Sequence, residues 1–458
     1  MKNYSLAPTD ENAYEMLKAN PIGRSDDVFR FVELLSHMEN SCYSIALNGE
    51  WGSGKTFFVK QVKLILDAEN PQSNLPEIMR LKVKGLIPNQ FTCPDCYTTV
   101  YYDAWANDNH EDPLLSLIYE AIRSGQSDYS PERERGLCQA ASSIADLLTG
   151  KGVSDALKAL QESNELENMQ KGVDLESLVR DFINYLIEEQ GNRLVFFIDE
   201  LDRCKPDYAI RFLERIKHYF DDERVTFVFS VSLSQLQWTV KSYYGSEFNS
   251  TRYLDKFFDI RLTLPHVNYE DFLKNRLNMW VNDLVSTVGM EVIKYYQFSL
   301  REMERYIRLL KIVEHVAQKI QPGSPGRNAV LFSATYFVPI MLGLQMHNIK
   351  KFNDFLSGDD AGPLKEILMN TSVILDTRLL LSWGESYATG GGIISQAGKE
   401  TESIEERIDK IYKVLFGRYN FNANGPLEIG QMLFTATTRE EVERITSVLS
   451  PLTDFDQI

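Results

Sequence analysis

The sequence has little of several features that mark specialised classes of protein. Five cysteines in 458 residues are too few and too scattered for a disulfide framework, so we expect a reducing compartment and a cytoplasmic protein. The six histidines are scattered too, and no Ser/His/Asp or Cys/His nucleophile arrangement is apparent. Positive charge is in deficit, because 48 Lys and Arg against 65 Asp and Glu leave a formal net charge of −17. That balance disfavours broad binding to nucleic acid or to an anionic membrane.

Apolar segments for export or membrane insertion are also lacking. The stretch from Met1 to Leu17 has no apolar core of a signal peptide. The most apolar run, residues 328–349, contains no Asp, Glu, Lys or Arg. A spanning helix needs about 20 predominantly apolar residues, whereas this run is interrupted by Pro339 and Gly343. We expect a buried helix here and no membrane span.

What is present is ordinary globular material, with 43% hydrophobic and 25% charged residues. Apolar runs at 194–198 and 225–231 are typical of strands buried on both faces of a parallel sheet, and residues 207–220 between them have a helical period. Residues 44–48 form a further strand, followed by a glycine-rich loop and a helix over 56–66. Residues 98–102 read as another strand. The pattern predicts an α/β fold with a parallel sheet flanked by helices.

Outside that core the sequence predicts helices and loops. Residues 1–20 are polar and are interpreted as a loose lead-in, and residues 26–38 as a helix. Residues 122–175 are rich in polar residues and read as an inserted helical region. From Val267 onward the helical period dominates, with no further parallel strand. We expect a flexible loop at the glycine-rich residues 388–395 and a solvent-edge strand at 80–84, where basic and apolar residues alternate.

The strongest chemical signal is the segment from Gly49 to Thr56, GEWGSGKT, which matches G-x-x-x-x-G-K-[ST] after a strand and before a helix. Glycines let successive backbone N–H groups wrap phosphates without Cβ clashes. Lys55 is placed to reach the β- and γ-phosphates, and the Thr56 hydroxyl to ligate Mg²⁺. The helix N-terminus adds its dipole. The segment predicts a phosphate-binding loop.

An acidic strand end supplies the second half of such a site. The run at 194–198 delivers Asp199 to the mouth of the sheet, where it can hold Mg²⁺ directly or through water. Glu200 follows at once and is placed to orient and deprotonate the attacking water. Adjacent Asp and Glu favour hydrolysis over mere holding of a nucleotide.

Together these segments resemble the KAP family of P-loop NTPases, near the AAA+ and STAND ATPases. The Glu-Trp inside the loop and the tail Ile198-Asp-Glu-Leu-Asp-Arg-Cys204 make the resemblance specific. Further similar segments follow in order over about residues 20–320: Pro21–Arg24, which in related ATPases contacts adenine; Tyr102–Trp105; Tyr253–Phe258 with Leu264-Pro265; and Ser299–Arg305, an arginine motif of the helical domain. Some family members carry paired transmembrane helices in the insertion, whereas here it is polar.

The resemblance implies an ASCE-type sheet of strand order 51432, ATP as ligand and a helical lid. We therefore divide the chain into a lead-in (1–20), a NTPase core (21–265), a lid (266–320) and a mainly helical region of unassigned role (321–458). We assign catalysis to Glu200 and Lys55, and Mg²⁺ to Thr56 and Asp199. The residues assigned to nucleotide binding are Ile22, Gly23, Arg24, Gly49, Glu50, Trp51, Gly52, Ser53, Gly54, Lys55, Thr56, Phe57, Asp103, Ser232 and Arg301.

Several side chains keep two interpretations. Asp103 either contacts the water or the metal's outer shell, or caps its strand. Ser230 and Ser232 either sense the γ-phosphate or are buried strand serines. Asp202 and Arg203 either orient a neighbouring subunit or form a local salt bridge. Arg301 would act from the lid in cis, and a role for Arg252 as a finger in trans is not favoured.

Cys93-Pro-Asp-Cys96 is half of a zinc site, and no second CxxC or HxxxH pair completes it. We favour a Pro-Asp turn joining two strands.

The resulting hypothesis is Mg-dependent ATP hydrolysis that couples nucleotide state to conformational change or assembly. The resemblance implies bacterial defence against phage or other mobile elements, with a homo-oligomer or an effector protein as partner. Two alternatives stay open. One is a nucleotide-switched scaffold with little turnover. The other is a nucleic-acid-stimulated motor or loader, which the net charge disfavours.

Overall fold

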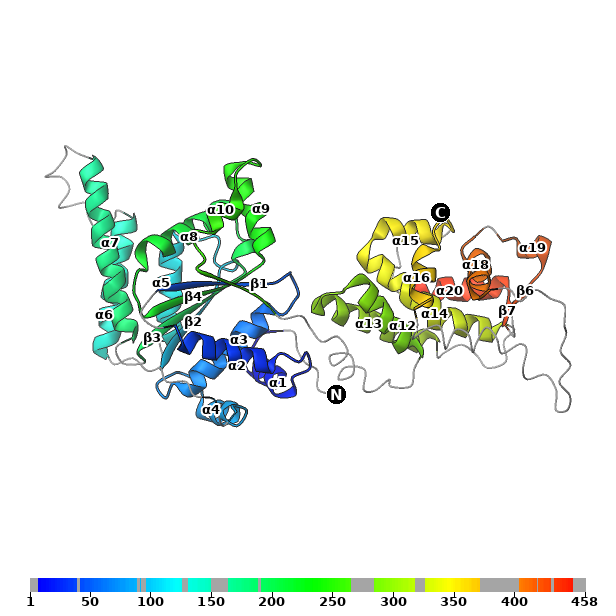
Figure 1. The fold of residues 1–458 in the computed structure, drawn as a ribbon, viewed down its shortest axis with the longest axis horizontal. Helices are drawn as coiled ribbons and strands as arrows, with labels where there is room; N and C mark the ends of the chain where they lie inside the picture. The colour runs from blue at the N-terminus through cyan, green and yellow to red at the C-terminus, as the bar shows by residue number, and fades with distance from the viewer. Residues whose placement is uncertain are drawn as a thin grey trace. The chain divides into compact units, whose positions relative to one another are not determined.

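The structure is a computed structural model of the chain, shown in Figure 1. It describes residues 7–38, 42–88, 91, 96–125, 131–149, 164–187, 191–264, 284–317, 326–370, 403–417, 419–429 and 432–447. The chain divides into two compact units, Met1–Asn268 and Tyr269–Ile458.

The first unit is built on a five-stranded parallel sheet. Its strands are β1 (Tyr43–Asn48), β2 (Tyr97–Asp103), β3 (Arg193–Asp199), β4 (Val225–Val231) and β5 (Ile260–Thr263). They lie in the order β2-β3-β4-β1-β5, and each neighbouring pair is parallel. Every residue of β3 and β4 is buried, as their continuous apolar runs predict. The expected α/β class and the 51432 order are confirmed.

Helices cover both faces of this sheet (Figure 1). Strand residues such as Ile45, Val195 and Val228 pack on one helical layer, and their neighbours Ala46, Phe196 and Phe227 pack on the other. The first layer contains α1 (Asp10–Ala19), α2 (Ser25–Ser36), α3 (Lys55–Glu69) and α4 (Glu77–Lys84). The second contains α5 (Pro113–Gly125), α6 (Pro131–Thr149), α7 (Asn164–Ile187), α8 (Pro206–Tyr219), α9 (Leu233–Tyr244) and α10 (Ser250–Leu254).

Two expectations about this unit were wrong. The lead-in contains α1, whose Ala13, Tyr14 and Leu17 are buried, so its polar residues form only the outer face of an amphipathic helix. The expected edge strand at 80–84 lies in helix α4. Five residues are too few to distinguish a period of 2 from one of 3.6. The residues buried here, Arg80 and Val83, are three positions apart, as on one side of a helix.

The polar insertion is helical where the structure describes it. Its helices α6 and α7 pack against each other. Leu137 and Ile144 of α6 join Val179 and Phe182 of α7 in the core of the first unit. The insertion therefore extends the layer formed by α5 and α8.

The second unit is mainly helical. It contains α12 (Leu284–Tyr296), α13 (Leu300–Ala317), α14 (Arg327–His347), α15 (Ile349–Leu356), α16 (Gly362–Leu368), α18 (Ile404–Leu415), α19 (Phe421–Asn424), α20 (Ala436–Ser447) and a short antiparallel pair, β6 (Leu427–Ile429) and β7 (Met432–Phe434). Helices α12 and α13, from the predicted lid, pack on α14, from the region after it. The structure thus has no division at residue 320. The glycine-rich residues 388–395 lie outside the described residues.

Helix α14 is the centre of the second unit. Within the described residues it is the one helix long and apolar enough to cross a membrane, and 78% of its most apolar window is buried inside the protein. The expected buried helix is confirmed. Gly343 lets α14 approach α12 closely, because a Cβ there would overlap Val292 Cγ1.

Replacing Gly343 by Val should destabilise the second unit. The added side chain would collide with Val292 and with Tyr296, whose Cε2 lies 3.2 Å from the Cβ position. Overpacking of this kind costs about 1–3 kcal/mol. We expect a lower midpoint of thermal unfolding, followed by circular dichroism.

Gly85→Val is the control, because Gly85 has a φ of −68° and its Cβ position lies 3.4 Å from the nearest atom. Adding Val292→Ala should recover part of the loss. An equal loss with and without Val292→Ala would contradict the steric explanation.

Candidate nucleotide-binding site

The loop after β1 is folded as a phosphate-binding loop requires. Gly52 and Gly54 have φ of 78° and 92°, which side chains of L-residues rarely adopt. A Cβ on Gly49 would lie 2.8 Å from Ser53 Oγ, so a side chain at that position would displace the Ser53 hydroxyl. The Gly49 N–H donates to Val231 O at 3.1 Å, which ties the start of the loop to the end of β4.

Lys55 opens α3 and turns its amine back into the loop. Its Nζ donates to Gly49 O at 2.6 Å and to Glu50 O at 3.1 Å. Burial lowers the pKa of Lys55, while Asp202 and Asp199 oppose that shift. The loop and the acidic strand end therefore share one electrostatic environment.

Three polar side chains lie in a row where the strands end. The register pairs Asp103 of β2 with Asp199 of β3, and Asp199 with Ser230 of β4. Directly paired residues project from the same face of a sheet. The face in question is the one covered by α3, because Phe197 and Val228, two residues earlier, pack in that layer.

Asp199 is held from several directions. It is 1% exposed, and its Oδ2 accepts a hydrogen bond from the Tyr101 hydroxyl at 2.9 Å. Its Oδ1 accepts from the Glu200 N–H at 3.0 Å. The Lys60 amine lies 3.4 Å from the centroid of the Tyr101 ring. Burial and the nearby Asp199 raise the pKa of Tyr101, which therefore stays a donor.

Glu200 adopts an unusual backbone conformation, with φ of 60° and ψ of 23°. Its carbonyl accepts from the Arg203 N–H at 3.0 Å, which closes the short turn η2 (Leu201–Arg203). Its carboxylate pairs with Arg203 at 3.0 Å. Burial raises the pKa of Glu200, whereas Arg203 acts to lower it.

Two tryptophans flank that ion pair. The Trp51 indole N–H donates to Asp202 Oδ2 at 2.6 Å. The Arg203 guanidinium carbon lies 5.7 Å from the Trp51 ring and 5.5 Å from the Trp105 ring. Asp202 and Arg203 thus make local contacts, one of the two interpretations that their sequence position allows.

The segment before α2 also meets the loop. Arg24 NH1 donates to Ser53 O at 2.7 Å. Ile22 and Arg24 line a small pocket with Gly54 and Phe57. The structure therefore brings five of the predicted nucleotide-binding residues together.

A family model described as the KAP family P-loop domain matches residues 28–317, more than half of the chain. The chain belongs to the KAP family of P-loop NTPases. Among solved structures, the Aeropyrum pernix ORC2 protein, in ADPNP and ADP complexes, aligns over 93% of each chain with 12% identity and a TM-score of 0.32, too slight a similarity to support an argument. No curated protein sequence matches the chain. Family membership identifies the first unit, which contains most of residues 28–317, as a nucleotide-binding P-loop domain.

The residues of this KAP domain suit a magnesium nucleotide. Ser53 Oγ and Ser230 Oγ are buried and have no hydrogen-bond partner among the described residues. Buried hydroxyls without partners are rare in native proteins and call for an explanation. The Asp199 carboxylate and the Thr56 hydroxyl are oxygen ligands of the kind that Mg²⁺ prefers.

The remaining residues predicted to act at the site either make other contacts or are exposed. Asp103 Oδ1 accepts from the Ala106 N–H at 2.9 Å, as expected for a strand-end cap. Ser232 is buried, and its Oγ lies 3.0 Å from Ser234 Oγ. Arg301 is an exposed residue of α13 in the second unit, and Arg252 an exposed residue of α10.

The predicted Pro-Asp turn at residues 93–96 lies mostly outside the described residues. Cys93 lies outside the described residues, and Cys96 is exposed with a free thiol. Within the part of the chain that is described, no group of three His, Cys, Asp or Glu side chains could hold a metal ion.

Sequence reasoning missed Tyr101 and Lys60. One signal was available: Tyr101 lies two residues before Asp103, so both project from the same face of β2. Lys60 lies five residues beyond Lys55, and only the packing of α3 on β2 brings it over the Tyr101 ring.

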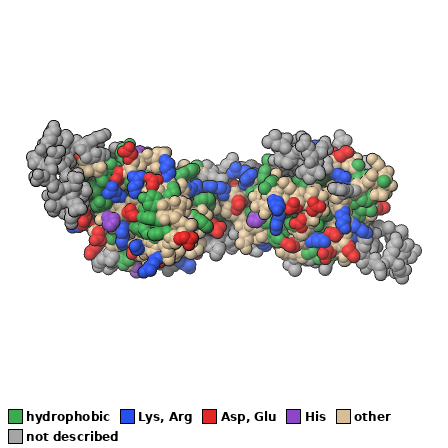
Figure 2. Space-filling model, turned by 90° about the horizontal axis from the view of Figure 1, so that it is seen from above, with side chains coloured by type: hydrophobic (Ala, Val, Ile, Leu, Met, Phe, Trp, Pro, Cys, Tyr) green, Lys and Arg blue, Asp and Glu red, His purple; other side chains and the backbone are tan. Residues whose placement is uncertain are grey.

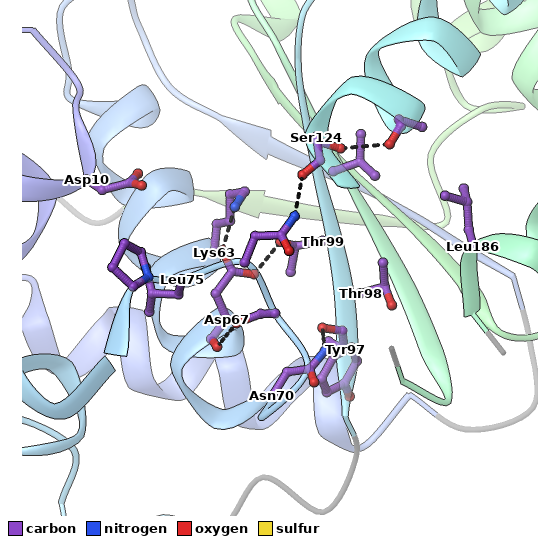
Figure 3. A pocket seen from close by; sticks show the side chains of 15 residues that line it. Asp10, Lys63, Asp67, Asn70, Leu75, Tyr97, Thr98, Thr99, Ser124 and Leu186 are labelled. Carbon is purple, nitrogen blue, oxygen red and sulfur yellow. Dashed lines mark hydrogen bonds and ion pairs between the residues drawn. The ribbon is translucent and has the colours of Figure 1, made fainter. Parts of the chain in front are cut away.

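A second pocket of about 230 Å³ lies beside α3 and β2, lined by Tyr97, Thr98 and Thr99 (Figure 3). Several of its polar groups are engaged with each other, whereas the buried Thr98 Oγ1 has no hydrogen-bond partner among the described residues. Asp67 accepts from the Lys63 amine and from the Thr99 hydroxyl, both at 2.5 Å. These contacts hold the C-terminal half of α3 on the edge strand.

The next feature is the distribution of charged side chains on one face of the protein. On the face shown in Figure 2, basic and acidic side chains are intermixed rather than gathered into a basic stripe.

Tyr101→Phe should destabilise the KAP domain, because it removes the hydroxyl donor to the buried Asp199. Hydrogen bonds to charged groups contribute about 1.5–3 kcal/mol. We expect a comparable fall in the free energy of unfolding, measured by urea titration. Tyr119→Phe, at an exposed position, should leave it unchanged. Equal values for the two variants would contradict the role given to Tyr101.

Proposed function

We propose that this KAP protein hydrolyses ATP in a Mg²⁺-dependent reaction. The observation that supports it best is the position of Glu200, next to the buried Asp199 and in the same electrostatic environment as Lys55. A protein that only holds a nucleotide has no need of a carboxylate at that position.

Each residue has a proposed role that follows from its chemistry. The loop N–H groups and Lys55 bind the phosphates. To do so, the Lys55 amine exchanges its contacts with Gly49 O and Glu50 O for phosphate oxygens. Thr56 and Asp199 hold the metal ion, which when bound neutralises phosphate charge. Arg24 fixes the loop through Ser53 O, and Ile22 and Phe57 offer an apolar surface for the base.

Glu200 is the proposed general base. Its carboxylate accepts the proton of the attacking water, which makes the oxygen a better nucleophile as the bond to phosphorus forms. Ser230 or Ser232 supplies a hydroxyl near the γ-phosphate, and Ser230 is the better placed because it is paired directly with Asp199.

Steady-state hydrolysis of Mg-ATP by the purified protein tests the proposal. We expect Glu200→Gln to bind ATP normally and to lose turnover by about 10²–10⁴-fold, as for the loss of a general base. Lys55→Ala should weaken ATP binding by about 10–100-fold, because it removes charged hydrogen bonds to phosphate. Binding without turnover in the wild type would instead favour the nucleotide-switched scaffold.

Removing the metal gives an independent test. Chelation by EDTA should weaken ATP binding by the wild type, measured by calorimetry. In Asp199→Asn the effect of EDTA should be much smaller, because one metal ligand has lost its charge. An equal effect in both proteins would show that Asp199 is not a ligand.

We also propose that nucleotide state controls assembly in the cytoplasm, with a second copy of the chain or an effector protein as partner. Arg301 is the candidate that would report the nucleotide to the helical region. A nucleic-acid motor is disfavoured, and stimulation of turnover by DNA or RNA would revive it.

The biological role we propose is defence against phage or other mobile elements, on the family resemblance alone. A bacterial strain expressing the chain should plate phage less efficiently than the same strain expressing Lys55→Ala. Equal plating of a broad phage panel on the two strains would contradict the proposed defence role. It would not bear on the proposed hydrolysis of ATP.

A further inference from the structure

The contact between Glu200 and Arg203 is part of a larger cluster made from three strand ends. We name it the tryptophan–arginine cluster: Trp51, Trp105, Glu200, Asp202 and Arg203. Trp51 comes from the loop after β1, Trp105 from the turn after β2, and the other three from the turn after β3. One guanidinium contacts side chains from all three segments.

Hydrogen bonds of its main chain hold the backbone of Glu200 in an unusual conformation. A non-glycine residue at positive φ is strained, so neighbouring contacts must maintain it. The N–H of Glu200 donates to Asp199 Oδ1, and its carbonyl accepts from the Arg203 N–H and, at 3.7 Å, from the Cys204 thiol. This turn fixes where the side chain of Glu200 begins.

The charges around Glu200 then decide where its carboxylate lies. Asp199, Asp103 and Asp202 are its acidic neighbours, and each of them repels it. Arg203 is the basic group paired with it, with both side chains about one-fifth exposed. An ion pair that is partly withdrawn from water is screened less than one on the surface. Arg203 therefore offsets the repulsion and selects one position for the carboxylate.

Arg203 is itself held from outside the turn. A guanidinium over the faces of two indole rings gains cation–π attraction and loses freedom of rotation. Trp51 is fixed in turn, because its N–H donates to the buried Asp202. The phosphate-binding loop is thereby linked to the turn that carries Glu200.

We propose that Arg203 is a positioning residue for Glu200, and that Trp51 and Trp105 hold Arg203 in place. The inference rests on the proposed function of Glu200 and adds to it the residues that place its carboxylate.

The first test is a kinetic cycle on the full chain. Arg203→Ala should lower kcat for ATP by about 10–100-fold, because a misplaced catalytic group loses that much, and should leave ATP affinity within about twofold by calorimetry. Arg203→Lys should recover part of kcat. In the Glu200→Gln background Arg203→Ala should cause no further loss, since it acts through Glu200.

Two matched controls accompany it. Arg180→Ala removes an arginine paired to a glutamate at 3.3 Å on α7, away from the cluster, and should leave kcat unchanged. Trp51→Phe keeps a ring but loses the N–H to Asp202, and should lower kcat roughly three- to tenfold. Trp238→Phe, at an exposed indole with Lys241 over its ring, should have no effect.

The outcomes separate this inference from the proposed function. An unchanged or raised kcat in Arg203→Ala overturns it, as does a large loss of ATP affinity, which would make Arg203 a phosphate ligand. Independent losses from Arg203→Ala and Glu200→Gln overturn it too.

If the wild type does not hydrolyse ATP, the proposed function fails. In that case the same variants, singly and combined, are compared by the midpoints of thermal unfolding of the nucleotide-free protein. Coupled changes for Arg203→Ala and Glu200→Gln support the contact, and additive changes overturn it.

Discussion

The register between β3 and its two neighbours is the constraint on which the candidate site depends. A shift of one residue in a strand moves every side chain to the other face. Asp103, Asp199 and Ser230 would then no longer emerge together beside α3. The register is secured by burial, because all seven residues of β3 and of β4 are buried on both faces. Apolar packing thus places polar chemistry at the edge of the sheet.

The side chain of Lys55 stabilises the phosphate-binding loop in the absence of a ligand. Lys55 is buried and donates to the carbonyls of Gly49 and Glu50. An unpaired buried ammonium group is costly, and these contacts limit that cost. They also shape the loop around the position where phosphate oxygens are proposed to bind. The loop is therefore largely organised in advance, which reduces the entropy lost on binding.

Much of this arrangement was predictable from sequence. The rest was not predictable, and the reasons can be identified. Gly49–Thr56 and Asp199-Glu200 are contiguous motifs with a known chemical meaning, and continuous apolar runs identified β3 and β4. The position of Arg203 between Trp51 and Trp105 depends on packing against residues about 150 and 100 positions earlier in the chain. No local pattern encodes such packing. Helix α4 was misassigned because five residues cannot separate a period of 2 from one of 3.6. The second unit includes helices on both sides of residue 320, since α14 buries apolar faces of α12 and α13. No local sequence pattern marks the boundary between the two units.

The buried Arg80 gives α3 two unequal ends. Its guanidinium donates to the carbonyls of Asp67 and Ala68 at the C-terminus of α3, and to Ser73 O and Leu75 O in the segment that follows. Carbonyls at a helix terminus lack partners within the helix, so this contact keeps that end from fraying. The opposite end of the same helix begins in the loop at Gly54. The C-terminal end of α3 is therefore anchored by a side chain of α4, whereas the conformation of the phosphate-binding loop sets where its N-terminal end begins.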